Sequence, residues 1–274
     1  MRLSLTYRLL CAAAAWLIAT AGFGQAPASS LERGISLYQE QDRIGALTQF
    51  LIFINSREEV DHETALANHY VGRLFAESGL HKKALNYLLL AEGQNQENAG
   101  LARDIAALVG DQYLQLNNPK KARQYFQALA ETNAADAEER IVVYQKIASS
   151  FQAGPERNLD SSLYYNQRIL VLAKGVTNPE FAIKAHNNLG YIHNFLKQYK
   201  VANTEFEAAL TIANQHQRKD LTGSILLNQA IVLNNKGRQT QAIEKLQQAR
   251  APIFSHNRNT EKANYYNLLA GFYF

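Results

Sequence analysis

The chain repeats itself at intervals of 38 to 40 residues, and this periodicity constrains its fold more than any other feature. In each copy a small residue is followed twelve positions later by a second small residue, and four positions after that by an aromatic residue or leucine. The clear copies are Gly34, Ala46, Phe50; Gly72, Ala84, Leu88; Gly110, Ala122, Phe126; Gly190, Ala202, Phe206; and Ala230, Ala242, Leu246. A degenerate fourth copy has Ala148 and Ser162, with two extra residues around Gly154-Pro155. A fixed period of this length is typical of stacked supersecondary units.

The spacing inside each copy predicts two amphipathic helices joined by a short polar turn. Apolar residues recur every three or four positions on both sides of the turn, as around Gly190 and Ala202. A small residue on each helix lets the two backbones approach, and the large residue fills the space beside the contact. Neither helix could bury its apolar face alone, so neighbouring pairs must share one core. The sequence therefore predicts an all-α fold.

These repeats resemble tetratricopeptide repeats, most clearly in the fifth copy, and the resemblance covers essentially the whole chain after residue 24. The usual repeat has about 34 residues. The longer copies here are similar to those of signalling adaptors and bacterial sensor proteins. The resemblance implies a right-handed α-solenoid over residues 25–274, with about six helix–turn–helix repeats plus the first helix of a seventh. It also implies a concave groove, lined by the first helix of each pair, that binds a protein or peptide partner.

The first 24 residues predict a cleavable signal peptide. Arg2 and Arg8 provide the positive region, and the apolar stretch of residues 9–21 is shorter than the ~20 residues of a comfortable membrane span. Cleavage could follow Ala21 or Gly24, and we favour Gln25 as the mature N-terminus. We expect export to the periplasm or out of a bacterial cell; an uncleaved N-terminal anchor is the alternative. The single cysteine, Cys11, would be removed, so the mature chain could form no disulfide and would have no membrane span.

Charge and motifs argue against nucleic-acid binding and catalysis. The formal charge is +4, and removing two arginines leaves +2. The remaining Lys and Arg residues are spread along the chain, and pairs such as Lys120-Lys121 and Arg218-Lys219 are typical of solvated helix ends; a nucleic-acid binder normally carries a basic stripe. His186 and His193 share a helix face, but they occupy positions where the family places packing aromatics, and no further metal ligands lie nearby in the sequence. With no phosphate-binding loop and no nucleophile elbow, we predict no enzyme, no cofactor and no metal.

The predicted groove becomes rich in carboxamides in its C-terminal half. Positions three before, one after and four after each first-helix small residue share a face. The candidate peptide-binding residues are Gln145, Gln152, Lys184, Asn187, Tyr191, Asn194, Asn234 and Asn267. A carboxamide both donates and accepts hydrogen bonds, so a row of them can bind the backbone of an extended peptide; the resemblance implies this use for the asparagines. The alternative is that they only keep the concave face soluble.

Residues 261–274 restart the repeat pattern with no second helix, and they end in the apolar run Gly271-Phe272-Tyr273-Phe274. We expect a further C-terminal domain or a partner to cover this end, because terminal repeats normally end on a polar face. Two functions follow from the sequence. One is an exported scaffold that binds a peptide or protein. The other is the extracytoplasmic sensor region of a longer signal-transduction protein, such as a membrane-bound histidine kinase or a transcription regulator.

Overall fold

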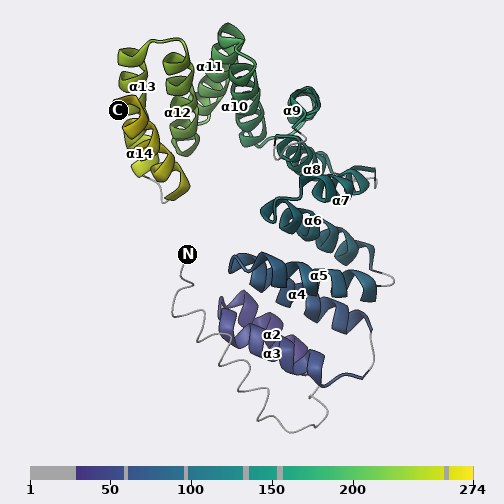
Figure 1. Cartoon of the computed structure of the whole chain (residues 1–274). Helices are drawn as coiled ribbons and strands as arrows, with labels where there is room; N and C mark the ends of the chain where they lie inside the picture. The colour runs from purple at the N-terminus through teal and green to yellow at the C-terminus, as the bar shows by residue number, and fades with distance from the viewer. Residues whose placement is uncertain are drawn as a thin grey trace. The chain divides into compact units, whose positions relative to one another are not determined.

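The computed structural model describes residues 29–58, 61–95, 98–131, 136–152, 157–255 and 259–273. The regular secondary structure among these residues is α-helical (Figure 1). The helices are α2 (Ser29–Gln39), α3 (Arg43–Asn55), α4 (His62–Glu77), α5 (His81–Gln94), α6 (Ala99–Gln115), α7 (Pro119–Glu131), α8 (Ala137–Ser150), α9 (Leu159–Ala173), α10 (Glu180–Phe195), α11 (Tyr199–Gln215), α12 (Lys219–Asn235), α13 (Gln239–Phe254) and α14 (Asn259–Tyr273). The predicted signal peptide, residues 1–24, lies outside the described residues. Within those residues no helix is long and apolar enough to cross a membrane.

The chain divides into two compact units, Met1–Leu129 and Ala130–Phe274, and each is built from helix pairs. In the first unit the pairs α2/α3, α4/α5 and α6/α7 correspond to the first three sequence repeats. A Cβ atom added at Gly34 would lie 2.7 Å from the ring of Phe50, and one at Gly72 would lie 2.7 Å from the side chain of Leu88. The predicted contact between small and large residues is confirmed, because no larger residue fits at these positions without displacing its partner.

The second unit contains the pairs α8/α9, α10/α11 and α12/α13, followed by α14. In the fifth repeat a Cβ atom at Gly190 would lie 2.5 Å from the fully buried ring of Phe206. In the degenerate fourth repeat the contact is polar instead, since the Ser162 hydroxyl donates a 3.0 Å hydrogen bond to the carbonyl of Ala148. The fourth pair therefore forms without a bulky side chain at that contact.

A residue with positive φ lies in the turn between the two helices of five repeats. These residues are Gln41, Gly79, Asn117, Lys197 and Gly237, with φ values of 66°, 72°, 57°, 60° and 71°. Each stands seven positions after the small residue of its first helix. A left-handed residue after a helix end lets the following backbone N–H groups bond the last carbonyls. The turn geometry thus repeats, although glycine occupies it only twice among these five.

The last described helix, α14, packs against α12 and α13 through Tyr265 and Phe272, which are both buried. Its other side is open, because Tyr266 is 57% exposed and Ala270 is also exposed. The corresponding small residue of the sixth repeat, Ala230, is fully buried beneath α13. Coverage of this face by a further domain or a partner remains a prediction.

Candidate functional site

The second unit contains a cavity of about 540 Å³ bordered by three successive first helices, α8, α10 and α12, and by one residue of α14. These are the helices that the repeat pattern assigned to the concave face. The lining residues are Val142, Gln145, Lys146, Ser149, Ile183, Lys184, Asn187, Asn188, Leu221, Ser224, Ile225 and Glu261. The cavity therefore lies on helices for which the sequence predicted a binding groove.

The cavity combines an apolar floor with polar walls. Ile183, Leu221 and Ile225 are buried in the helix packing and contribute the floor. The carboxamides of α8 and α10 add hydrogen-bond donors and acceptors, and Ser149 and Ser224 add hydroxyl groups. This mixture can receive a ligand that is apolar in part and also has backbone-like polar groups.

Carboxamide pairs connect α10 to α12 beside the cavity. The Asn228 amide donates to Oδ1 of Asn187 at 3.0 Å, and the Asn235 amide donates to Oδ1 of Asn194 at 3.1 Å. The two bonds are one heptad apart on both helices, so they form two rungs between neighbouring repeats. Each rung fixes the orientation of a side chain that the sequence had placed in the groove.

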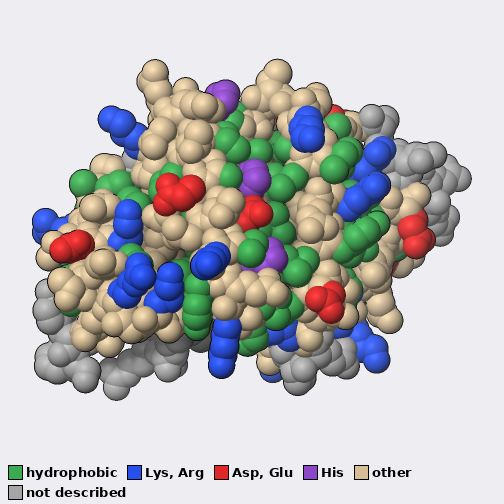
Figure 2. Space-filling view, turned by 90° about the horizontal axis from the view of Figure 1, so that it is seen from above, with side chains coloured by type: hydrophobic (Ala, Val, Ile, Leu, Met, Phe, Trp, Pro, Cys, Tyr) green, Lys and Arg blue, Asp and Glu red, His purple; other side chains and the backbone are tan. Residues whose placement is uncertain are grey.

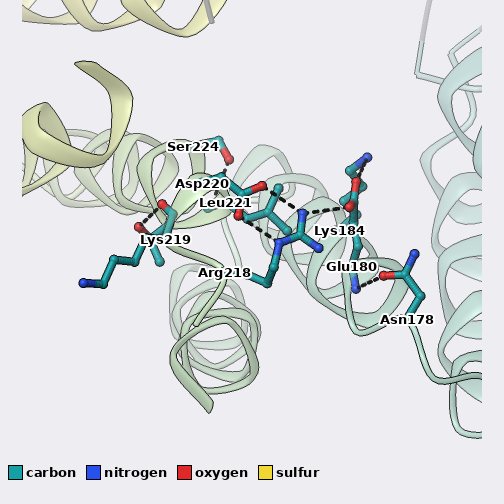
Figure 3. Close-up of polar contacts among 9 residues, drawn as sticks. Asn178, Glu180, Lys184, Arg218, Lys219, Asp220, Leu221 and Ser224 are labelled. Atoms are coloured by element: carbon teal, nitrogen blue, oxygen red, sulfur yellow. Dashed lines mark hydrogen bonds and ion pairs between the residues drawn. The ribbon is translucent and has the colours of Figure 1, made fainter. Parts of the chain in front are cut away.

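An ion-pair cluster fixes the edge of the cavity (Figure 3). Glu180 on α10 accepts hydrogen bonds from Lys184 Nζ at 2.6 Å and from Arg218 at 2.8 Å. Arg218 also donates two 2.8 Å bonds to the carboxylate of Asp220. The hydrogen bonds from Lys184 and Arg218 hold the pKa of Glu180 below its ordinary value, and the bonds to Asp220 and Glu180 raise the pKa of Arg218. Glu180 and Arg218 are therefore both stabilised in their charged forms, and their ion pair links the fifth repeat to the sixth.

Charged groups are dispersed on the face of the molecule that Figure 2 shows. On the face drawn in Figure 2, Lys and Arg side chains lie among Asp, Glu, hydrophobic and uncharged polar side chains. This view shows no single basic band.

Comparisons with known proteins identify the arrangement of the helices. A family model described as the C-terminal domain of Suppressor of spindle checkpoint defect 1 matches residues 167–273, and no curated protein matches the chain in sequence. Among solved structures, apo RapI has a TM-score of 0.68 at 15% identity, over 89% of this chain and 91% of RapI. YrrB, described as a TPR protein with an unusual peptide-binding site, has a TM-score of 0.53 at 19% identity, over 75% of this chain and 94% of YrrB. The chain has a tetratricopeptide-type helical-repeat fold.

A third solved structure shares this tetratricopeptide-type fold and covers a similar share of the chain to RapI. The apo form of the quorum sensor NprR from B. thuringiensis has a TM-score of 0.69 at 17% identity, over 88% of this chain and 68% of NprR. At these identities the likeness is one of fold. The predicted all-α repeat architecture is thereby confirmed.

Three of the eight residues predicted for the tetratricopeptide-type groove line the cavity. They are Gln145, Lys184 and Asn187. The Gln152 amide instead donates to the hydroxyl of Ser162 at 2.9 Å, inside its own repeat. The other four predicted residues, Tyr191, Asn194, Asn234 and Asn267, do not line the cavity; Tyr191 is 41% exposed one turn beyond Asn187, and Asn194 is largely buried in its rung.

Sequence reasoning missed several lining residues, and their positions explain why. Val142 and Ser224 stand six positions before the small residues Ala148 and Ala230, and Lys146 stands two positions before Ala148. On α10 and α12 the cavity thus lies toward the N-terminal half of the helix. The prediction that used positions four after the small residue pointed to the opposite ends. The missed residue Asn188 could have been found from its spacing, because it stands four positions after Lys184 and therefore shares a helix face with it.

The histidines take part in packing and hydrogen bonding. His186 Nδ1 lies 2.7 Å from Oε2 of Glu205 on α11, and His193 Nδ1 lies 2.6 Å from Oε1 of Gln198. The described residues contain no group of three or more His, Cys, Asp or Glu side chains that could hold a metal ion. In the first unit His69 is only 4% exposed, and its ring nitrogens have no hydrogen-bond partner among the described residues.

Proposed function

We propose that the cavity of the second unit binds an extended segment of a peptide or protein partner, and that this binding is the chain's function. The observation that carries the proposal is the combination of carboxamides and an apolar floor on three successive first helices. An extended peptide presents a donor and an acceptor at every residue, which side-chain amides can match. The apolar side chains of such a peptide can pack against Ile183 and Ile225 at the bottom of the cavity.

The size of the cavity and the relatives support this proposal. A volume of about 540 Å³ is within the range of ligand sites, about 300–1,000 Å³. YrrB, which has a similar fold, is described as having a peptide-binding site. Peptide binding by this chain is our inference from its own cavity.

The proposal is tested by filling the cavity. Peptides that bind the wild-type protein would first be selected from a random display library. Their affinity for the wild type and for Ser149→Trp would then be measured by calorimetry. Ser149 is exposed on α8 and lines the cavity, so this substitution places a large side chain there. The matched control is Thr211→Trp, an exposed position on α11 outside the cavity. We expect Ser149→Trp to weaken binding about tenfold or more, which corresponds to about 1.4 kcal/mol, and Thr211→Trp to leave it unchanged. Equal affinity for both variants would refute binding in this cavity.

We also propose that the protein is exported by residues 1–24. The sequence supports this through its charged start, apolar stretch and small-residue exit. Mass spectrometry of the protein from its native cells should find a mature N-terminus between Gly22 and Gln25. Recovery of a soluble cytoplasmic form with intact Met1 would contradict export.

A sensor role is the second candidate, favoured by the likeness to the quorum sensor NprR. A sensor must change conformation with its ligand, whereas a scaffold need not. Small-angle scattering with and without a selected peptide separates the two candidates. A change in the radius of gyration on saturation supports the sensor, and an unchanged value supports the scaffold.

A further inference from the structure

The second unit has another cavity, of about 420 Å³, that shares no lining residue with the first. It lies between the N-terminal half of α11 and the turn that joins α12 to α13. Its lining residues are Tyr199, Lys200, Asn203, Thr204, Glu207, Val232, Leu233, Lys236 and Arg238. We call this cavity the basic cleft.

Three cations surround the basic cleft, and none of them has an ion-pair partner within the described parts of the chain. They are Lys200 on α11 and Lys236 and Arg238 in the turn, and all are exposed. Gly237, with φ of +71°, stands between the last two, and the Arg238 N–H bonds the carbonyl of Leu233 at 2.9 Å. The tight turn therefore places both side chains at the rim of one cavity.

The single acid in the lining does not balance these charges. Glu207 accepts a 2.5 Å hydrogen bond from the buried amide of Gln229, which holds it against α12. The formal charge of the lining is three positive minus one negative, or +2. Lys200 and Arg238 also stand at the N-terminal ends of α11 and α13, where no acid lies in the first turn and no side chain caps the helix. Cations are unfavourable at that end of a helix, and an anion is favourable.

We propose that the basic cleft binds a small organic phosphate monoester. A monoester carries about −1.5 to −2 charges at pH 7, which matches the lining charge of +2. The hydroxyl of Tyr199 can donate to a phosphate oxygen in addition to the cations, whereas the hydroxyl of Thr204 donates to the carbonyl of Lys200 at 3.2 Å and would have to rotate to do so. The apolar atoms of Val232 and Leu233 provide a wall for the organic part of the ligand.

The volume favours an ester over free phosphate. A water molecule occupies about 30 Å³ of liquid, so a cleft of about 420 Å³ holds many more atoms than one phosphate ion has. The site is independent of the peptide-binding proposal, because neither its residues nor its ligand class are shared with the first cavity.

Calorimetry on the full chain tests the site with phenyl phosphate as the probe. Phenyl sulfate has nearly the same shape but one negative charge, and inorganic phosphate lacks the ring. We expect phenyl phosphate to bind most tightly of the three. The double variant Lys236→Gln with Arg238→Gln should weaken it about tenfold or more, because two charge-assisted contacts are lost. The matched control, Lys174→Gln with Lys219→Gln, removes the same charge from exposed positions outside the cleft and should leave affinity unchanged.

The pH dependence provides a second readout. The second pKa of a phosphate monoester is about 6, so the ligand loses one of its two negative charges as the pH falls through that value. Phenyl phosphate should therefore bind several-fold more weakly at pH 5 than at pH 7.5, and phenyl sulfate equally at both.

Three results would overturn the proposal. One is equal loss of affinity in the cleft variant and its control, which would indicate general attraction to a basic surface. Another is equal affinity for phenyl phosphate and phenyl sulfate at pH 7.5. The third is a phosphotyrosine peptide that binds far more tightly than phenyl phosphate, since the ligand would then be a phosphorylated partner instead of a small ester.

Discussion

Replacing Gly190 by alanine tests the contact on which each helix pair is built. The added Cβ would lie 2.5 to 2.8 Å from three atoms of the Phe206 ring, which is fully buried. A buried ring has little room to move, and overpacking of this kind costs about 1–3 kcal/mol. Alanine also gains about 1 kcal/mol of helix propensity over glycine. The expected net loss of stability is about 1 kcal/mol.

The chain itself contains the compensating change. In the sixth repeat the corresponding pair is Ala230 with Leu246, and both residues are fully buried. Phe206→Leu alone should destabilise the fifth repeat because it leaves part of a buried volume empty. Combined with Gly190→Ala it recreates the pair of the sixth repeat. The double variant should therefore be more stable than the sum of the single changes predicts, by about 1–2 kcal/mol.

Urea unfolding followed by far-ultraviolet circular dichroism measures all four members of this cycle. Gly34→Ala combined with Phe50→Leu, at the corresponding contact of the first repeat, gives an independent replicate in the other unit. Strictly additive free energies at both contacts would refute the argument that the small and large residues fit one another.

Three further predictions concern turns, rungs and pH. Lys197→Gly should stabilise the protein by about 1 kcal/mol because it relieves a positive φ of 60°, and Gly237→Lys should destabilise it by a similar amount, both measured by urea unfolding. Asn187→Ala and Asn228→Ala should each lower the free energy of unfolding, and their double-mutant cycle should give a coupling energy of about 0.5–1.5 kcal/mol. A coupling energy of zero would show that the hydrogen bond between these two side chains does not stabilise the fold. Burial lowers the pKa of His69 from 6.5 to about 4, so the folded protein favours the neutral imidazole. As the pH falls below 6.5 the unfolded chain takes up a proton at His69 that the folded chain does not, and the free energy of unfolding therefore decreases. Between pH 7 and pH 5 the wild type should lose about 2 kcal/mol more than His69→Leu, and parallel losses would contradict this.

The helix pairing could be predicted from the sequence because its cause is local and periodic. Gly190, Ala202 and Phe206 meet through contacts that one repeat defines almost alone, so spacing was sufficient. The left-handed turn residues were not predicted, since neither Gln41 nor Lys197 signals a positive φ by its chemistry. That conformation is imposed by the two helices that the turn connects.

The candidate site was only partly predictable, because it depends on how successive repeats stack. Asn187 was recognised as a groove residue, but its partner Asn228 lies 41 positions later on α12. Which residues meet across two first helices depends on the tilt and shift between repeats, and the sequence does not state either. The same uncertainty hid Val142 and Lys146, which lie on either side of the predicted Gln145 in the sequence of α8.

The most direct test of peptide binding is a nuclear magnetic resonance titration of methyl-labelled protein with a selected peptide. Intermolecular nuclear Overhauser effects should connect the peptide to the methyl groups of Val142, Ile183 and Ile225, which line the cavity. Val171, which is 61% exposed on α9 outside the cavity, should show none. Contacts to Val171 without contacts to Ile183 and Ile225 would contradict the account.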